Sequence, residues 1–186
     1  MVSTPDDPLS PARLRVMQII AAALLVGVLM FLGVALYMVL IQKQGQGLAP
    51  PRDVPFTTLI AGLVLVSDVP LAVFIPRTIV ENALKQMAAG TWRAPPGARP
   101  GDLSGDGVKL LLVRQTSLII TLALFEGAAF LGIMAFLLEA QVAALAVVAV
   151  AVFLMLMNFP TERRVRAWLD LHLQRLAEMQ TQPRAG

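Results

Sequence analysis

The sequence predicts an all-α membrane protein in which four transmembrane helices form a bundle. Of the 186 residues, 57% are hydrophobic and only 15% are charged, and the mean hydropathy is +0.73. Charged residues make up about 25% of an ordinary soluble domain. Four intervals between charged residues are long enough to cross a bilayer, which takes about 20 mostly apolar residues. The basic residues also gather on one side of the resulting topology.

The four predicted transmembrane helices cover residues 15–41, 56–75, 113–138 and 141–158. Each helix is predicted from an interval between two charged residues. The intervals 16–42 and 140–161 hold no charge, 54–76 is interrupted only by Asp68, and 115–138 only by Glu126. Segment 118–137 carries eleven Leu, Ile or Phe residues, whose insertion energies outweigh the cost of about 3 kcal/mol for one carboxylate. No small-residue cleavage site follows the first helix, so we expect it to remain as a signal-anchor.

The distribution of Lys and Arg predicts the orientation of the chain. Thirteen of the fifteen basic residues fall in the two terminal segments and the middle loop, and two fall in the first loop. The positive-inside rule therefore places both termini and the middle loop in the cytoplasm. Twelve of the fifteen basic residues are Arg, and Ala is abundant, which favours a GC-rich bacterial genome and an inner-membrane location. The expected partner is then the lipid bilayer, whose inner surface is anionic.

Two short amphipathic helices are expected on the cytoplasmic side, at about 78–89 and 161–180. Thr78-x-x-Glu81 reads as a capping box for the first, and Thr161 can cap the second. Residues 91–107 are rich in Pro and Gly and read as a linker. The apolar stripe of the second helix, which includes Trp168, is expected to lie on the membrane surface, with helix 78–89 as the competing surface.

The two halves of the chain share a pattern that is consistent with a tandem pair of helical hairpins. A shift of 100 residues aligns six identical apolar or small residues of the first and third transmembrane helices. Each half also passes from an apolar helix through a Phe-x-Pro or Phe-Pro step to an amphipathic helix. A duplication would give parallel repeats, because each copy has an even number of crossings.

Five residues are expected to anchor the protein at the membrane interface. Trp rings favour the headgroup region, and Arg side chains there meet anionic lipid. The predicted anchors are Trp92, Trp168, Arg163, Arg164 and Arg166.

Glu126 and Asp68 are the residues whose chemistry stands out, because an ionisable group at membrane depth indicates function by default. Glu126 lies near the middle of its helix among apolar and small residues, and Asp68 lies two residues before Pro70. No Lys or Arg is available in the membrane core to pair with either, so we expect protonated carboxyls or a shared proton. Two interpretations stay open: hydrogen bonding between helices, or carriage of protons or cations.

The sequence gives little support for a disulfide, a metal site or a catalytic site. The chain has no Cys, which excludes disulfides and thiolate chemistry. His172 is the only histidine and has no second ligand near it in sequence. The fragment Asp102 to Gly107 resembles the start of an EF-hand loop, but Val113 occupies the twelfth position, where a Glu is required. We therefore expect no enzyme activity, catalytic residue, cofactor, metal site or nucleic-acid partner.

Segment 122–132, Leu-Ala-Leu-Phe-Glu-Gly-Ala-Ala-Phe-Leu-Gly, resembles the carboxylate helix of the proteolipid (c) subunits of rotary ATPases. That resemblance implies that Glu126 carries the transported ion. The chain as a whole is similar to small, uncharacterised four-helix bacterial membrane proteins. These carry a third helix of the pattern LxEGxAFxxxxAxLLE, here 124–139, and a terminal FPTxxxVxxW step, here 159–168.

Together these features predict a structural or accessory membrane component that associates with itself or with another membrane protein. The alternative function is proton or cation translocation through Glu126 and Asp68.

Overall fold

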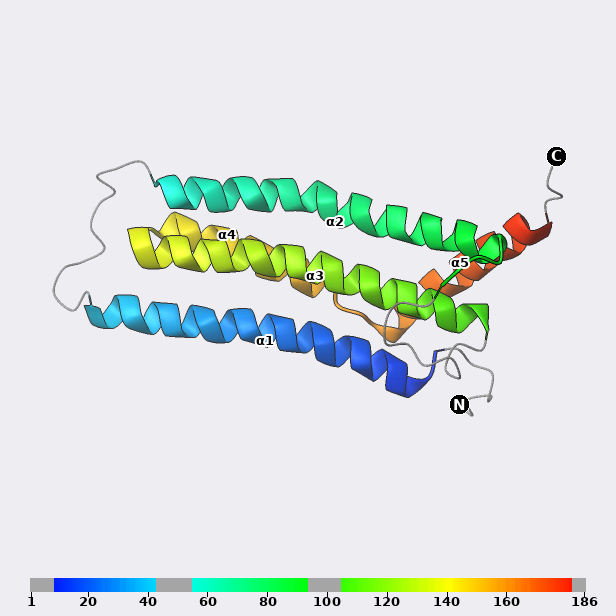
Figure 1. Ribbon diagram of the computed structural model, residues 1–186. Helices are drawn as coiled ribbons and strands as arrows, with labels where there is room; N and C mark the ends of the chain where they lie inside the picture. Colours follow the sequence, from blue (N-terminus) through cyan, green and yellow to red (C-terminus); the bar gives the residue numbers. More distant parts are fainter. Residues whose placement is uncertain (1–8, 43–54, 94–104, 182–186) are drawn as a thin grey trace. The chain divides into compact units, whose positions relative to one another are not determined.

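The computed structural model describes residues 9–42, 55–93 and 105–181, and every regular element in these ranges is an α-helix (Figure 1). The helices are α1 (Pro11–Gln42), α2 (Phe56–Ala88), α3 (Asp106–Glu139), α4 (Val142–Met157) and α5 (Glu162–Thr181). The predicted all-α class is confirmed. Most of the first predicted loop, between the spans 15–41 and 56–75, and most of the predicted linker 91–107 lie outside the described residues.

Three of the described helices, α1, α2 and α3, are each long and apolar enough to cross a membrane. They have 32, 33 and 34 residues, and at about 1.5 Å per residue each is longer than a hydrocarbon core of about 30 Å. Helices α4 and α5, bent by 63° at the break between them, pass the same test only as a pair. The structure therefore supports a multi-pass membrane protein with three or four spans.

The chain divides into two compact units. The apolar unit contains Ile20–Phe74 and Ile119–Phe159, and the basic unit contains Met1–Ile19, Ile75–Leu118 and Pro160–Gly186. All eleven Lys and Arg residues in the described ranges belong to the basic unit. The positive-inside rule assigns each of these eleven residues to the cytoplasm.

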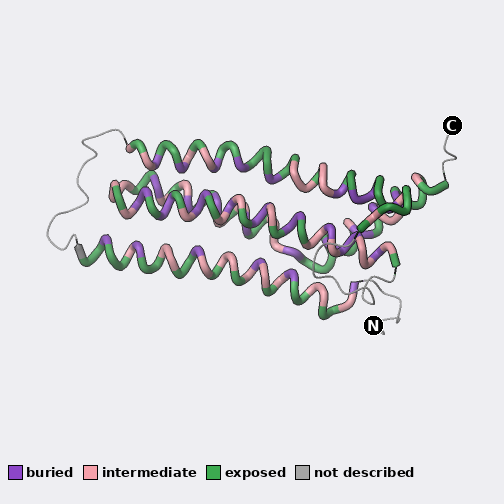
Figure 2. The backbone as a smooth tube through the Cα atoms, viewed as in Figure 1, coloured by how far each residue is buried: buried purple, intermediate pink, exposed green. Residues whose placement is uncertain are grey.

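In the apolar unit, portions of α1, α2 and α3 and the whole of α4 lie alongside one another (Figure 1). Half of the most apolar window of α3 is buried in the protein, against 28% for α2 and 17% for α1. The tube in Figure 2 shows exposed residues along most of α1 and along the first half of α2. Helix α3 is therefore the most deeply packed of the three long helices.

The contact between α3 and α4 depends on Gly132. A Cβ atom at this position would lie 2.9 Å from Cγ2 of Val148 and 3.3 Å from the carbonyl oxygen of Ala144. The missing side chain lets the two helices approach closely, as small residues commonly do in membrane proteins. A two-residue connection joins the helices, and its first residue, Ala140, has a φ of 52°. That left-handed conformation ends α3 and turns the chain into α4.

Glu139, the last residue of α3, caps the first turn of α2. Its carboxylate accepts hydrogen bonds from the backbone amides of Thr57 (2.5 Å) and Thr58 (3.1 Å) and from the hydroxyl of Thr58 (2.5 Å). The first amides of a helix have no partner within the helix, and Pro55, just before α2, has no polar side chain with which to cap them. The negative charge also lies at the favourable end of the α2 dipole. Glu139 therefore ties together two elements about 80 residues apart in sequence.

A second polar contact between helices lies at Ala72, four residues before Pro76. Proline has no amide hydrogen, so Pro76 leaves the Ala72 carbonyl without its helical partner. The hydroxyl of Thr121 on α3 donates to this carbonyl at 3.5 Å, and Thr121 is buried. A side chain from a neighbouring helix thus supplies the donor that proline removes.

The predicted separate helix at 78–89 is wrong, because residues 56–88 form one continuous helix. The hydroxyl of Thr78 donates to the carbonyl of Ile75 and does not cap a new helix. The Ala72 carbonyl, which Pro76 leaves without a helical donor, accepts a hydrogen bond from Thr121 of α3, and α2 continues through Pro76. At the corresponding step in the second half, Asn158 donates its side-chain amide to Leu154 as α4 ends, and the chain bends by 63° before α5.

Two other predicted boundaries also differ. Helix α1 begins at Pro11 and not at 15, and α3 begins at Asp106 and not at 113. The prediction used charges to end each span, whereas Lys, Arg and Gln favour helix and let the backbone continue past the apolar run.

The two predicted amphipathic faces are both buried within the basic unit. On α2 the buried residues of this unit are Val80, Ala83, Leu84 and Met87, and on α5 they are Val165, Leu169, His172 and Leu176. The α5 stripe is therefore covered by protein. This corresponds to the alternative in which the stripe packs on protein and not on the membrane surface. The outer face of α5 stays polar, with Arg163, Arg164 and Arg166 exposed.

Replacing Gly132 with Ala should destabilise the apolar unit by about 1–3 kcal/mol, because the new methyl group overlaps Val148. Gly127→Ala is the matched control on the same helix, since a Cβ atom at Gly127 meets nothing within 4 Å. Thermal unfolding in non-ionic detergent should show a lower midpoint for Gly132→Ala and an unchanged or higher midpoint for Gly127→Ala. Equal midpoints for the two variants would contradict the close α3–α4 contact.

Replacing Glu139 with Ala should lower the unfolding midpoint, because the amides of Thr57 and Thr58 lose their acceptor. Glu139→Gln keeps one acceptor oxygen and should fall between the wild type and Glu139→Ala. The order of the three unfolding midpoints checks the cap. If the Gln and Ala variants lose the same amount of stability, the hydrogen bonds to the carboxylate contribute nothing.

Candidate functional site

The two predicted ion carriers, Asp68 and Glu126, both belong to the apolar unit. Asp68 on α2 is buried, with 7% of its surface exposed, and Glu126 on α3 is partly exposed. Among the described residues, neither carboxyl forms a hydrogen bond or an ion pair, with the other or with any third residue. The structure therefore does not join them into one site.

The small residues around Glu126 divide into two groups. Ala128 and Gly132 are buried, and Gly132 makes the contact with α4. Ala123 and Gly127 are exposed, and Gly127 faces open space. The predicted close helix approach thus occurs on one side of Glu126, and the other side is left uncovered.

A concave site that the sequence did not predict lies in the basic unit. It is a pocket of about 490 Å³ between the second half of α2, the first part of α3, and α5. Three arginines from three different helices line it: Arg77 of α2, Arg114 of α3 and Arg175 of α5. The other lining residues are Pro76, Val80, Glu81, Leu84, Ser117, Trp168 and His172.

A stack of three side chains forms part of the pocket wall. The guanidinium carbon of Arg114 lies 5.5 Å from the centre of the Trp168 ring, a cation–π distance. The Trp168 ring in turn stacks on His172, with centroids 4.1 Å apart and planes at 25°. Trp168 and His172 are four residues apart on α5, so the helix itself aligns the two rings.

His172 is fixed by a hydrogen bond to its own helix. Its Nδ1 atom lies 2.7 Å from the carbonyl oxygen of Trp168. A carbonyl oxygen can only accept, so this contact assigns the hydrogen to Nδ1 and leaves Nε2 to accept a proton. Burial lowers the pKa of His172, the hydrogen bond opposes this effect, and the charges of Arg175 and Arg114 lower the pKa further. At neutral pH His172 is therefore a neutral residue in a positively charged setting.

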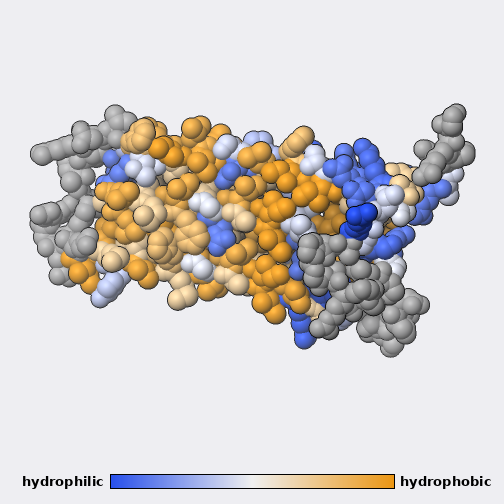
Figure 3. Space-filling model, viewed as in Figure 1, coloured by the Kyte–Doolittle hydropathy of each residue, from blue (hydrophilic) through white to orange (hydrophobic). Residues whose placement is uncertain are grey.

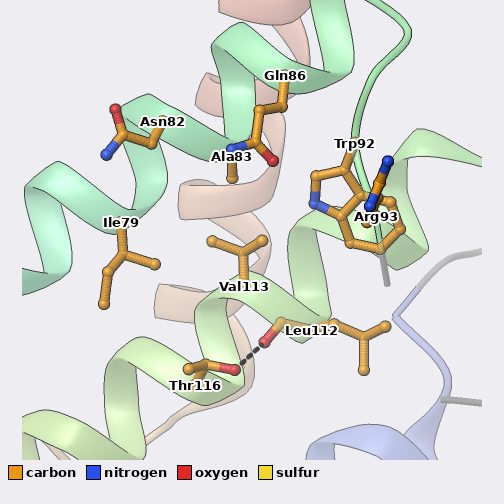
Figure 4. A pocket seen from close by; sticks show the side chains of 9 residues that line it. All are labelled: Ile79, Asn82, Ala83, Gln86, Trp92, Arg93, Leu112, Val113 and Thr116. Atoms are coloured by element: carbon orange, nitrogen blue, oxygen red, sulfur yellow. Dashed lines mark hydrogen bonds between the residues drawn. The ribbon is translucent and has the colours of Figure 1, made fainter. Parts of the chain in front are cut away.

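A second, smaller pocket of about 320 Å³ lies between α2 and α3 in the same unit (Figure 4). Trp92 and Arg93, which follow α2, line it together with Gln86 and Thr116. The Thr116 hydroxyl donates to the Leu112 carbonyl of its own helix, so its hydrogen is not available to a ligand in this pocket. Nζ of Lys109 lies 5.9 Å from the centre of the Trp92 ring and forms an ion pair with Asp106 at 2.7 Å.

The five predicted interface anchors all lie within the basic unit. Trp92 and Trp168 are half-buried against protein, and the three arginines of α5 are exposed. Arg166 forms an exposed ion pair with Glu162 at 3.3 Å. Their anchoring in lipid stays a prediction.

No group of three or more His, Asp or Glu side chains within the described ranges is placed to hold a metal ion. His172 lies among arginines, and the EF-hand-like residues 102–104 lie outside the described part of the chain.

Comparison of the chain with models of known families, with curated proteins and with solved structures finds no match. The functional argument therefore depends on the residues and their arrangement.

The basic pocket was not predicted from the sequence because its residues are far apart in the chain and its three arginines were counted only as markers of topology. Two local signals point toward it. Arg114 lies at the start of a predicted span, and Trp168 and His172 are aromatic residues one helical turn apart. The sequence does not reveal that α2, α3 and α5 bring these signals together.

The stability of the basic unit should fall as the pH drops below about 6.5. The unfolded chain protonates His172 near its ordinary pKa of 6.5, while the folded chain does so only at lower pH. Protonation therefore favours unfolding, and the stabilisation is complete only above the unfolded pKa. Unfolding midpoints measured in non-ionic detergent between pH 8 and pH 5 check this. His172→Gln should flatten this part of the profile, and an unchanged slope would assign the titration to another group.

Proposed function

We propose that this chain is a four-span protein of a bacterial inner membrane with both termini in the cytoplasm, and that it serves as a structural or accessory component. In this arrangement the apolar unit crosses the membrane, and the basic unit lies at the cytoplasmic surface. The protein then associates through its lipid-facing helices with itself or with another membrane protein.

The observation that carries the proposal is the apolar surface that the long helices leave uncovered. Tyr37 on α1, Leu63 on α2 and Leu138 on α3 are 66%, 70% and 70% exposed. On the face shown in Figure 3, the surface of the apolar unit is largely hydrophobic. Soluble monomers rarely expose contiguous apolar patches of more than a few hundred Å². Lipid or neighbouring transmembrane helices provide the surroundings that such a surface requires.

The fourth span of the proposal is α4 alone, with α5 at the surface. Helix α4 has 16 residues, which gives about 24 Å at the usual rise. A helix slightly shorter than the hydrocarbon core is accommodated by local thinning of the bilayer. The polar outer face of α5 and its exposed arginines favour a surface position for that helix.

The second candidate function, proton or cation translocation, is favoured by the environment of Asp68 and Glu126. Each carboxyl lacks a hydrogen bond or ion pair among the described residues, so each is available to bind a proton or a cation. The resemblance of segment 122–132 to proteolipid (c) subunits supports the same role for Glu126.

Reconstitution separates the two candidates. Proteoliposomes with an internal pH-sensitive dye should show no more proton flux than empty liposomes, for the wild type and for Glu126→Gln alike, because a structural component provides no pathway. Flux that the wild type supports and that Glu126→Gln or Asp68→Asn abolishes would replace the structural role with translocation.

Reporter fusions test the topology. Fusions after Gly90 and after Gly186 should report the cytoplasm, and a fusion after Gly47 should report the opposite side, because thirteen of the fifteen basic residues lie on the former side. An external signal at Gly90 would end the four-span arrangement.

A further inference from the structure

The pocket between α2, α3 and α5 carries an excess of positive charge. Arg77, Arg114 and Arg175 line it, with Glu81 as the one acidic lining residue. None of the three arginines forms an ion pair with any carboxylate in the described ranges. Three guanidinium groups around one cavity repel one another unless an anion enters.

Arg114 is already held in position for such an anion. Its guanidinium lies over the Trp168 ring at 5.5 Å, and Trp168 is stacked on His172. Stacking occupies the flat face of a guanidinium and leaves the N–H groups at its edge for a ligand. His172 is held in turn by the hydrogen bond from its Nδ1 atom to the Trp168 carbonyl, which fixes the ring that supports Trp168.

The chemistry of the pocket favours a phosphate group. The forked donors of a guanidinium match the oxygens of phosphate in a bidentate arrangement. The pocket volume of about 490 Å³ is within the range of small-molecule sites and leaves room for a group attached to the phosphate. Pro76, Val80 and Leu84 provide an apolar wall, which suits a ligand with apolar as well as anionic parts.

The place of the arginines along their helices favours a lipid as the source of the phosphate. Arg77 follows Phe74 by one helical turn, where the apolar run of α2 ends, and Arg114 lies four residues, about one helical turn, before Leu118, where the long apolar run of α3 begins. In the proposed topology both side chains lie at the depth of the cytoplasmic headgroups. Basic pockets between transmembrane helices on that side are suited to anionic headgroups.

We propose that the pocket formed by Arg77, Arg114 and Arg175 binds the phosphate of an anionic phospholipid headgroup. This inference rests on the proposed membrane location of the protein. It adds to that function a specific contact between the basic unit and the lipid of the inner leaflet.

Native mass spectrometry of the full chain in non-ionic detergent tests the proposal directly. Phosphatidylglycerol, phosphatidylcholine and inorganic phosphate are titrated separately, and the mass of each adduct identifies the bound species. Phosphatidylglycerol should bind saturably, with phosphatidylcholine and inorganic phosphate much weaker.

The double variant Arg77→Gln/Arg175→Gln should bind phosphatidylglycerol about tenfold more weakly, because two charge-assisted contacts are lost. Its matched control is Lys85→Gln/Arg163→Gln, which removes the same charge from the same two helices at exposed positions outside this pocket. The control pair should bind like the wild type. Because the four substituted side chains are exposed, both variants should keep the wild-type unfolding midpoint, which is measured alongside.

Three outcomes would overturn the proposal. Equal weakening by the pocket pair and the control pair would indicate general surface charge. Equal affinity for phosphatidylcholine would indicate a site for acyl chains. Inorganic phosphate that binds as tightly as phosphatidylglycerol would make the source a soluble phosphate. Binding in detergent does not depend on topology, so failure here leaves the reporter fusions to test the proposed function separately.

Discussion

A helix that crosses lipid must satisfy its polar groups from within the protein, because hydrocarbon has no water to replace a missing partner. Two contacts of the apolar unit meet this constraint. Glu139, at the end of α3, accepts from the first amides of α2, and Thr121 donates to the Ala72 carbonyl that Pro76 leaves without a helical partner. With Gly132 bringing α4 close to α3, α3 contacts α2 and α4 through small or polar residues, and it contacts α1 through the rings of Phe130 and Phe31. The arrangement of the apolar unit depends on these contacts as much as on its hydrophobicity.

The same constraint explains how charge is distributed. All eleven described Lys and Arg residues belong to the basic unit, where water and anionic headgroups can solvate them in the proposed topology. Arg114 is the exception that needs internal support, and Trp168 provides it by stacking. In the apolar unit, Asp68 and Glu126 lack comparable support among the described residues. The two carboxyls and the arginines of the basic pocket are therefore charged groups that form no ion pair among the described residues.

Much of the fold could be predicted from sequence, because membrane insertion depends on length and hydropathy, which are local properties. The all-helical class, the extent of α4 to within a residue at each end, and the buried faces around Leu84 and Leu169 were all predictable in this way. The continuity of α2 through Pro76 was not predicted, and neither was the hydrogen bond to the Ala72 carbonyl, whose donor, Thr121, lies 45 residues beyond Pro76 in the chain. The cap at Glu139 and the basic pocket were missed for the same reason, since each joins residues that no local pattern relates.

The central claim is that the apolar unit crosses the membrane four times and leaves the basic unit on one side. The absence of Cys from the sequence allows single cysteines to be introduced without removing any. Gln141→Cys, in the α3–α4 turn, precedes α4 in the sequence, and Gln174→Cys, on the exposed face of α5, follows it. In intact cells a membrane-impermeant maleimide should label Gln141→Cys directly and Gln174→Cys only after the inner face is opened. Labelling of both positions from the same side would contradict the account, because α4 would then not cross the membrane.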